Sequence, residues 1–262
     1  MQIVLLRVGI DTGSGGIHGP LFSDGSFEYI PIPDCFRDKG VDKRTYGNTR
    51  GKRGRRLADY FPEARREKVF DQSIHFDPEF ETFTYGDPTR PKALLRQLSE
   101  GSLLVFYAGL KGWDFDCPPA LYIIGCFEVA RAGLATSFSQ AELARMFQNN
   151  FHVMHGDVFE DQKDRLVLVK GTANSRLLKK AVKISSVGTD RNGRPIHRLA
   201  PEMQAVFGGF AGNTSIQRSP PRWVASEFTQ RAAQFISALR YHEVIERPPT
   251  SAPSASRHLA MP

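Results

Sequence analysis

A carboxylate and a hydroxyl group stand in a glycine-rich segment near the N-terminus. Asp11 and Ser14 lie within residues 9–17, directly after an apolar run. Glycines allow the backbone to approach a bulky partner closely, so these two groups could act on a ligand. The spacing matches neither the dinucleotide pattern GxGxxG nor the P-loop, which ends in Gly-Lys-Ser or Gly-Lys-Thr. The alternative is a tight connection that needs glycines for backbone reasons alone.

A second group of chemically capable side chains falls within residues 73–87. His75, Asp77 and Glu79 alternate with apolar residues, which would place them on one face of an extended segment. Such a set could bind a divalent ion, but without a distal His or Cys the metal case is weak, and we expect no metal or other cofactor. Asp77 and Asp87 each precede a proline, where a carboxylate often serves only the loop.

The two histidines near residue 150 fit a structural role better than a catalytic one. His152 and His155 fall between a predicted helix and a predicted strand, in what we expect to be a loop. Nothing in their spacing indicates a catalytic pair. We therefore predict that both are structural.

The positive charge of the chain is concentrated in one segment. Residues 43–68 hold ten of the 35 Lys and Arg residues and three of the 28 Asp and Glu residues, which accounts for the whole formal charge of +7. Interleaved glycines would let this backbone follow a chain of phosphates, so the pattern favours a polyanion as partner. A solvated surface loop without a ligand is the alternative. The candidate phosphate contacts are Arg50, Lys52, Arg53, Arg55 and Arg56.

Two apolar runs should form the strands on which these groups are carried. Residues 102–110 and 120–130 are apolar, contain aromatics and are bounded by glycine or proline, which is typical of buried strands. The loop between them, residues 111–119, carries Trp113 beside the strand ends. With a further strand at residues 2–8, the pattern predicts an α+β fold with a mixed central sheet flanked by helices. This sheet could curl into a partial barrel.

Helix signals are strongest in the second half of the chain. Ser139 with Glu142 three residues later makes a capping box, and residues 223–244 carry an apolar stripe at helical spacing. No linker interrupts residues 1–246, so we expect a single domain there. Residues 247–262 are rich in proline and serine and should form a disordered tail.

Composition excludes several classes of protein. No window approaches the about 18 apolar residues that a membrane span requires, and the N-terminus does not resemble a signal peptide, so we expect a cytoplasmic protein. Cys35, Cys117 and Cys126 are odd in number and lack a CxxC pair, which argues against a disulfide framework or a zinc knuckle. No obligatory protein partner is indicated.

Five short motifs, taken in order, are similar to those of a known family. They are a strand followed by Asp-x-x-x-Gly-Gly at residues 11–16, Ile-Pro-Ile-Pro at 30–33, His-x-Asp-Pro at 75–78, Gly-x-Leu-x-x-Phe-Tyr-x-Gly at 101–109, and Ile-Ile-Gly-x-Phe-x-Val at 123–129. Over about residues 1–235 the chain thereby resembles the third family of nucleotide-modification-associated domains. Members of this family are associated with modified nucleobases in bacterial and phage DNA.

The resemblance implies a DNA glycosylase. Such an enzyme would excise a modified base of the glucosylated hydroxymethylcytosine type from phage DNA and leave abasic sites, as a defence against phage. Its partner would be double-stranded DNA with the modified nucleotide flipped out of the helix. A non-catalytic reader of modified bases and an enzyme that makes the modified base are the alternatives.

Glycosidic cleavage requires a carboxylate that stabilises the cationic sugar and orients water, beside a pocket that stacks the base. Asp11 is the first candidate for the carboxylate, and Asp77 and Asp87 come next. Aromatics of a central strand can instead belong to the core. The candidate residues of the base pocket are Ser14, Tyr85, Phe106, Tyr107 and Trp113.

Overall fold

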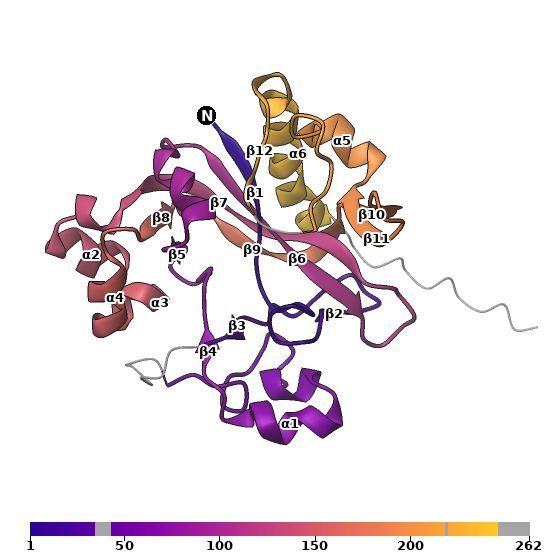
Figure 1. The fold of residues 1–262 in the computed structure, drawn as a ribbon, viewed down its shortest axis with the longest axis horizontal. Helices are drawn as coiled ribbons and strands as arrows, with labels where there is room; N and C mark the ends of the chain where they lie inside the picture. The colour runs from indigo at the N-terminus through magenta and orange to yellow at the C-terminus, as the bar shows by residue number, and fades with distance from the viewer. Residues whose placement is uncertain (35–42, 218–219, 246–262) are drawn as a thin grey trace, which may run out of the picture.

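A mixed β-sheet forms the centre of the computed structural model, which describes residues 1–34, 43–217 and 220–245 (Figure 1). Strand β1 runs parallel to β6, and the other neighbours along the main path of the sheet are antiparallel. The order along this path is β12 (Arg222–Trp223), β1 (Ile3–Arg7), β6 (Leu103–Gly112), β7 (Ala120–Leu134), β8 (Val167–Gly171) and β5 (Thr84–Asp87). Two further strands, β2 (Gly19–Leu21) and β9 (Arg176–Lys183), pair with β6 and β7. The α+β prediction is confirmed, and the described strands do not close into a barrel.

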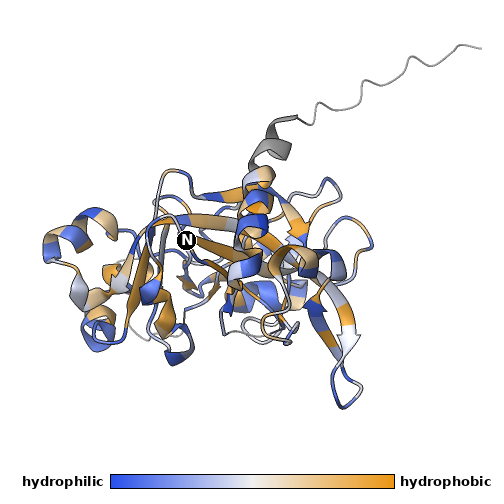
Figure 2. Ribbon diagram, turned by 90° about the horizontal axis from the view of Figure 1, so that it is seen from above, coloured by the Kyte–Doolittle hydropathy of each residue, from blue (hydrophilic) through white to orange (hydrophobic). Residues whose placement is uncertain are grey.

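The central pair of strands is the predicted apolar pair. β6 and β7 begin within one residue of the expected positions and are buried over most of their length. Their side chains pack on both faces of the sheet, which is why neither strand alternates between apolar and polar residues. Figure 2 shows the apolar strands at the centre with more polar helices around them.

Two groups of helices cover opposite ends of the sheet (Figure 1). Near β8 lie α2 (Gln140–Met146), α3 (Phe151–Met154) and α4 (Gly156–Gln162), whereas α5 (Pro201–Phe207) and α6 (Ser226–Ile245) lie near β1. The predicted capping box at the start of α2 is present, because the hydroxyl of Ser139 accepts a hydrogen bond from the Glu142 amide and the Glu142 carboxylate accepts one from the Ser139 amide. The prediction of a loop around His152 and His155 is wrong, because His152 lies in α3 and His155 directly precedes α4.

The basic segment is folded onto a core of its own. It contains the 3₁₀ turn η1 (Leu57–Tyr60) and helix α1 (Glu63–Phe70), and it packs near the short strands β3 (Ile32–Pro33) and β4 (Ile74–His75). Tyr46 and Phe61 are fully buried there with their ring centroids 5.0 Å apart. The cationic side chains therefore project from a packed scaffold.

The remaining elements complete the edges of the fold. They are η2 (Arg90–Gln97), η3 (Ala135–Ser137), and the hairpin of β10 (Ser185–Thr189) with β11 (Pro195–Leu199). Among the described helices none is both long and apolar enough to cross a membrane. The predicted tail and Cys35 lie outside the described residues.

Candidate active-site cleft

A cleft of about 1240 Å³ opens where β1 runs into the glycine-rich loop. Its other walls come from β4, β5 and the segment between them, from α3, and from the β10–β11 hairpin. Five of the predicted site residues, which are distant from one another in sequence, line this cleft. They are Asp11, Ser14, Asp77, Tyr85 and Asp87.

The glycine-rich loop fixes the carboxylate of Asp11. Its Oδ1 accepts hydrogen bonds from the amides of Gly13 at 2.7 Å and Ser14 at 2.9 Å, and from the Ser14 hydroxyl at 3.2 Å. Its Oδ2 lies 2.9 Å from Nη2 of Arg7. Gly15 has φ +117°, and a Cβ atom there would lie 2.4 Å from Ile10, so the loop requires glycine at this position. Asp11 is thus a charged, oriented and partly exposed group.

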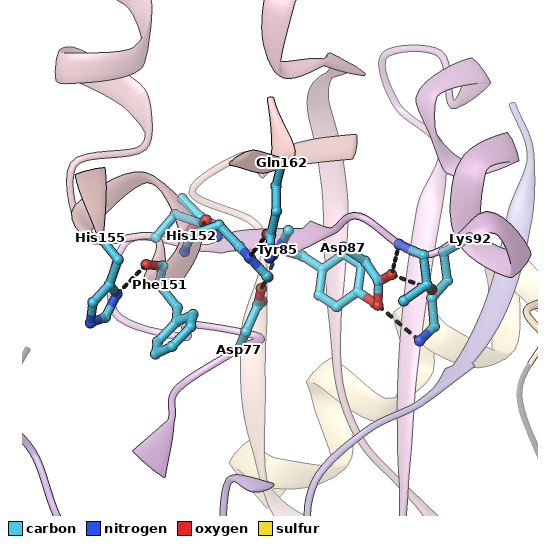
Figure 3. A network of polar contacts seen from close by, with 12 residues as sticks. Asp77, Tyr85, Asp87, Lys92, Phe151, His152, His155 and Gln162 are labelled. Carbon is cyan, nitrogen blue, oxygen red and sulfur yellow. Dashed lines mark hydrogen bonds and ion pairs between the residues drawn. The ribbon is translucent and has the colours of Figure 1, made fainter. Parts of the chain in front are cut away.

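Asp87 is held by the residues around it (Figure 3). Lys92 forms an ion pair with its Oδ2 at 2.8 Å, and the Tyr85 hydroxyl donates to the same oxygen at 3.1 Å. The amide of Thr89 donates to Oδ1 at 2.7 Å, and the Thr89 hydroxyl also bonds to that oxygen. Both carboxylate oxygens are therefore engaged, although the side chain still contributes to the wall of the cleft.

Asp77 and His152 meet at a buried position in the cleft wall. Nε2 of His152 lies 3.6 Å from Oδ2 of Asp77, and both side chains are almost entirely inaccessible to solvent. Burial raises the pKa of Asp77 well above its ordinary value, with smaller contributions from the charges of Asp87 and Glu79 that act in the same direction. Burial also lowers the pKa of His152 to about 4. Desolvation thus disfavours the charged form of each group.

A hydrogen bond at the ring nitrogen Nδ1, which is not the nitrogen nearest Asp77, fixes the orientation of the His152 ring. Its Nδ1 lies 2.7 Å from Oε1 of Gln162 at the end of α4 (Figure 3), and an amide oxygen can only accept a hydrogen bond. With Oε1 of Gln162 as the acceptor, the neutral ring is protonated at Nδ1, and Nε2 is turned toward Asp77. The backbone amide of His152 is capped by Oδ1 of Asn150 at 3.1 Å.

His75 completes a compact group with these two residues. The ligand atoms of His75, Asp77 and His152 all lie within 4.8 Å of one another. The ring of His75 is stacked on Phe151, with centroids 3.9 Å apart, and burial lowers its pKa well below the ordinary value. Glu79 does not belong to this group, because its carboxylate accepts hydrogen bonds from the amides of Glu81 and Thr82 and so stabilises a turn.

Cationic side chains line the same cleft. Arg7 and Arg222 come from the neighbouring strands β1 and β12, and Lys92 and Arg194 come from η2 and the β10–β11 hairpin. The Nε atoms of Arg7 and Arg222 are buried and have no hydrogen-bond partner within the described ranges. These guanidinium groups face a cavity where an anionic group, such as a phosphate, would supply the missing acceptors.

The other aromatic candidates lie away from the cleft lining. Phe106 and Tyr107 are fully buried in the sheet core, where the Tyr107 hydroxyl donates to the carbonyl of Ile216 at 3.1 Å. Trp113 is 39% exposed, and its ring meets Tyr60 edge-on with centroids 5.2 Å apart. Of the five predicted pocket residues, only Ser14 and Tyr85 line the cleft.

The five predicted phosphate contacts sit on an exposed loop that is anchored by a buried carboxylate. Glu28 accepts hydrogen bonds from the backbone amides of Lys52 at 2.9 Å and Arg53 at 3.4 Å. The Arg53 side chain pairs with Asp24 at 2.6 Å and covers the ring of Phe22. The side chains of Arg50, Lys52, Arg53, Arg55 and Arg56 are all exposed, and none of them lines the cleft.

His152 is one of the site residues that sequence reasoning missed, together with Arg7, Lys92, Arg194 and Arg222. It is separated from Asp77 by 75 positions, and no motif spacing connects the two residues. The only local sign is Asn150, which can cap a helix two residues ahead of His152 and thereby suggests a fixed backbone. The pairing itself results from the packing of α3 against β5.

The fold and the cleft define an α+β protein with a large cavity of mixed charge, lined by carboxylates, arginines and two histidines. The model of the family described as nucleotide modification associated domain 3 matches residues 2–244. The chain therefore belongs to this family, which confirms the resemblance of its motifs and indicates a role with modified nucleotides. No curated protein and no solved structure matches the chain.

Proposed function

We propose that the protein is a DNA glycosylase that removes a bulky modified base, of the glucosylated hydroxymethylcytosine type, from phage DNA. The observation that carries this proposal is the convergence of four carboxylates and four cationic side chains on one cleft. Glycosidic cleavage needs a carboxylate beside the sugar, and a flipped nucleotide brings a phosphate that cations can hold. Family membership supports the involvement of a modified nucleotide.

The dimensions of the cleft favour a large base. Pockets for small molecules usually measure about 300–1,000 Å³. The cavity here, at about 1240 Å³, exceeds that range. A nucleobase that carries an attached hexose would use the additional room, whereas an unmodified cytosine would leave much of the cleft filled with water.

Asp11 is the carboxylate to which we assign catalysis. Its side chain is about one-fifth exposed, so it can reach a ligand, and two backbone amides hold it in one orientation. A fixed negative charge of this kind stabilises an oxocarbenium-like sugar without having to reorganise during the reaction. Asp87 and Asp77 are the alternatives, and the same assay examines their Asn variants.

The basic segment is joined to the rim of the cleft. Nη2 of Arg65 in α1 donates to the carbonyl of Gly15 at 2.8 Å, which ties this segment to the loop that carries Asp11. DNA held by the exposed cations of residues 50–56 would therefore lie against a segment that this hydrogen bond connects to the site. In the proposed complex these cations hold the backbone, and the cleft receives the flipped nucleotide.

The test is direct measurement of base release. Purified full-length protein is incubated with phage DNA that carries glucosylated hydroxymethylcytosine and, in parallel, with unmodified DNA. Mass spectrometry then measures the released base, and an aldehyde-reactive probe measures abasic sites. We expect equal amounts of free modified base and abasic sites from the modified DNA alone.

The Asp11→Asn variant identifies the catalytic group. Asn keeps the shape but removes the charge, so we expect base release to fall by about 10²–10³-fold while modified DNA remains bound. Asp161→Asn, an exposed change at an ion pair with Arg165, is the matched control and should retain full activity. If the wild type binds modified DNA but releases no base, the protein is a reader and the glycosylase proposal fails.

A further inference from the structure

We propose that His75, Asp77 and His152 bind a divalent metal ion of the Zn²⁺ class in the wall of the cleft. Two imidazole nitrogens and one carboxylate oxygen form a ligand set that zinc adopts in open, three-ligand sites. All three residues line the cleft, and their ligand atoms lie within 4.8 Å of one another. The proposal concerns metal binding alone and does not depend on glycosylase activity.

The first argument is the orientation of His152. Its Nδ1 proton is directed to Gln162 at 2.7 Å, so the lone pair of Nε2 faces Asp77. A second ring nitrogen that is hydrogen-bonded to a buried acceptor is the usual support of a metal-binding histidine. Gln162 is itself buried, and its position at the end of α4 holds the acceptor in place.

The second argument is an oxygen atom without a partner. Oδ2 of Asp77 accepts a hydrogen bond from the Gly86 amide at 2.8 Å, whereas Oδ1 is buried and has no hydrogen-bond partner in the part of the chain that is described. A buried carboxylate oxygen in this situation lacks the compensation that burial normally requires. A cation that both oxygens of Asp77 coordinate, between the two histidines, would provide it.

The third argument is the close approach of the backbone. A Cβ atom at Gly86 would lie 2.8 Å from Cδ2 of His152, so only glycine lets β5 pass this near to the imidazole. Behind the ring, the side chain of Asn150 holds the backbone amide of His152 at 3.1 Å. The position of the histidine is thus determined by packing on one side and by hydrogen bonds on the other.

The distances suit an ion after a small adjustment. Zinc bonds of about 2.0–2.1 Å in a tetrahedron place neighbouring ligand atoms about 3.4 Å apart. Nε2 of His152 and Oδ2 of Asp77 already lie 3.6 Å apart. All three ligand atoms lie within 4.8 Å of one another, so the ring of His75, which is stacked on Phe151, would have to shift by about an ångström to complete the site. The fourth position would face the cleft and take water or a ligand.

The charges around the group allow a cation to enter. The charge of Lys92 acts on His75, but the Lys92 ammonium group is already paired with Asp87 at 2.8 Å. Asp87 and Glu79 add negative charge near Asp77. The local field therefore does not oppose a divalent ion.

The test measures metal binding in the absence of DNA. Full-length protein is purified without a polyhistidine tag, stripped with a chelator and titrated with Zn²⁺, and bound metal is quantified by mass spectrometry. We expect one equivalent of Zn²⁺, and visible d–d absorption of the tetrahedral type when Co²⁺ replaces it. Binding of less than one-tenth of an equivalent by the folded wild type would overturn the proposal.

Variants locate the ion. His152→Gln should weaken Zn²⁺ binding by at least about 100-fold, and Gln162→Leu, which removes only the supporting acceptor, by about 10–100-fold. His155→Gln is the matched control, because His155 lies on the same segment and against the same Phe151 ring but outside the group of three. Equal binding by all four proteins would place the metal elsewhere and refute the assignment.

A measurement of thermal stability distinguishes the loss of metal binding from the misfolding of a variant. Zn²⁺ should raise the melting temperature of the wild type and of the His155→Gln variant, because a ligand that binds only the native state stabilises it. If His152→Gln does not fold, the Gln162→Leu variant and the Co²⁺ spectrum of the wild type still decide the question. The absence of both a Co²⁺ spectrum and a Zn²⁺-dependent shift in the wild type would count against the site.

Discussion

The guanidinium group of Arg7 lies 2.9 Å from the carboxylate of Asp11 (Nη2 to Oδ2), at the point where β1 ends and the glycine-rich loop begins. Arg7 also has a buried Nε without a hydrogen-bond partner in the described structure, so it faces both the carboxylate and the cleft. This pair connects the central sheet to the group that we assign to catalysis.

Replacement of Arg7 should reduce base release by misplacing Asp11. We expect Arg7→Met to lower the rate constant by about 10²-fold, since a preorganised charge loses its support, while Arg7→Lys retains more activity because it keeps the cation. The measurement is single-turnover release of modified base at saturating protein. Equal losses for the Met and Lys variants would indicate that the charge of Arg7 is unimportant and that only its shape matters.

The exposed arginines of the basic segment should determine how DNA affinity depends on salt. Each phosphate contact contributes about 0.9 to the slope of log K against log salt concentration, so Arg55→Ala should reduce that slope by about one. The measurement is fluorescence anisotropy with a labelled duplex over a range of salt concentrations. Arg165→Ala, which removes an exposed arginine outside the segment, is the control. An unchanged slope for Arg55→Ala would show that Arg55 does not contact the phosphates.

Glu28 should make stability fall as pH rises. Burial raises the pKa of Glu28 above its ordinary value, although hydrogen bonds from the Lys52 and Arg53 amides partly oppose this. The folded state therefore binds the proton more tightly than the unfolded state, whose pKa is about 4.3. The resulting stabilisation is complete below that pKa and is lost as pH rises through the folded-state pKa.

The Glu28→Gln variant removes this titration. As pH rises above about 4 and through the folded-state pKa of Glu28, the free energy of unfolding of the variant should therefore improve relative to that of the wild type. Urea denaturation at a series of pH values measures the difference. Parallel pH profiles for the two proteins would contradict a raised pKa in the folded state.

Phe106 should contribute strongly to the free energy of unfolding. Its ring lies 4.7 Å from that of Phe127 and 5.6 Å from that of Phe80, centroid to centroid, inside the sheet core. Phe106→Ala should cost about 3–5 kcal/mol because it leaves a cavity. Chemical denaturation measures this cost, and DNA binding is compared below the unfolding temperature. Near-normal stability with weakened binding would instead assign the ring to the base pocket.

Local patterns in the sequence were sufficient to predict the central strands and the start of helix α2. The apolar runs that became β6 and β7 and the capping box of Ser139 with Glu142 depend on neighbouring residues, so they can be recognised without knowledge of the fold. The glycine-rich loop around Asp11 was recognised for the same reason. Charge concentration also follows from the sequence alone, because it requires only counting along the chain.

The contents of the cleft were decided by tertiary structure. Asp77 meets His152 because α3 packs against β5, and no periodicity connects positions 75 residues apart. Phe106 and Tyr107 lie in the core because both faces of the sheet are covered, a fact that an aromatic run on one strand does not reveal. The sequence by itself determined which segments form strands and helices and where the charge lies. Long-range packing decided which side chains share the cleft and how burial alters their pKa values, because both depend on contacts between distant segments.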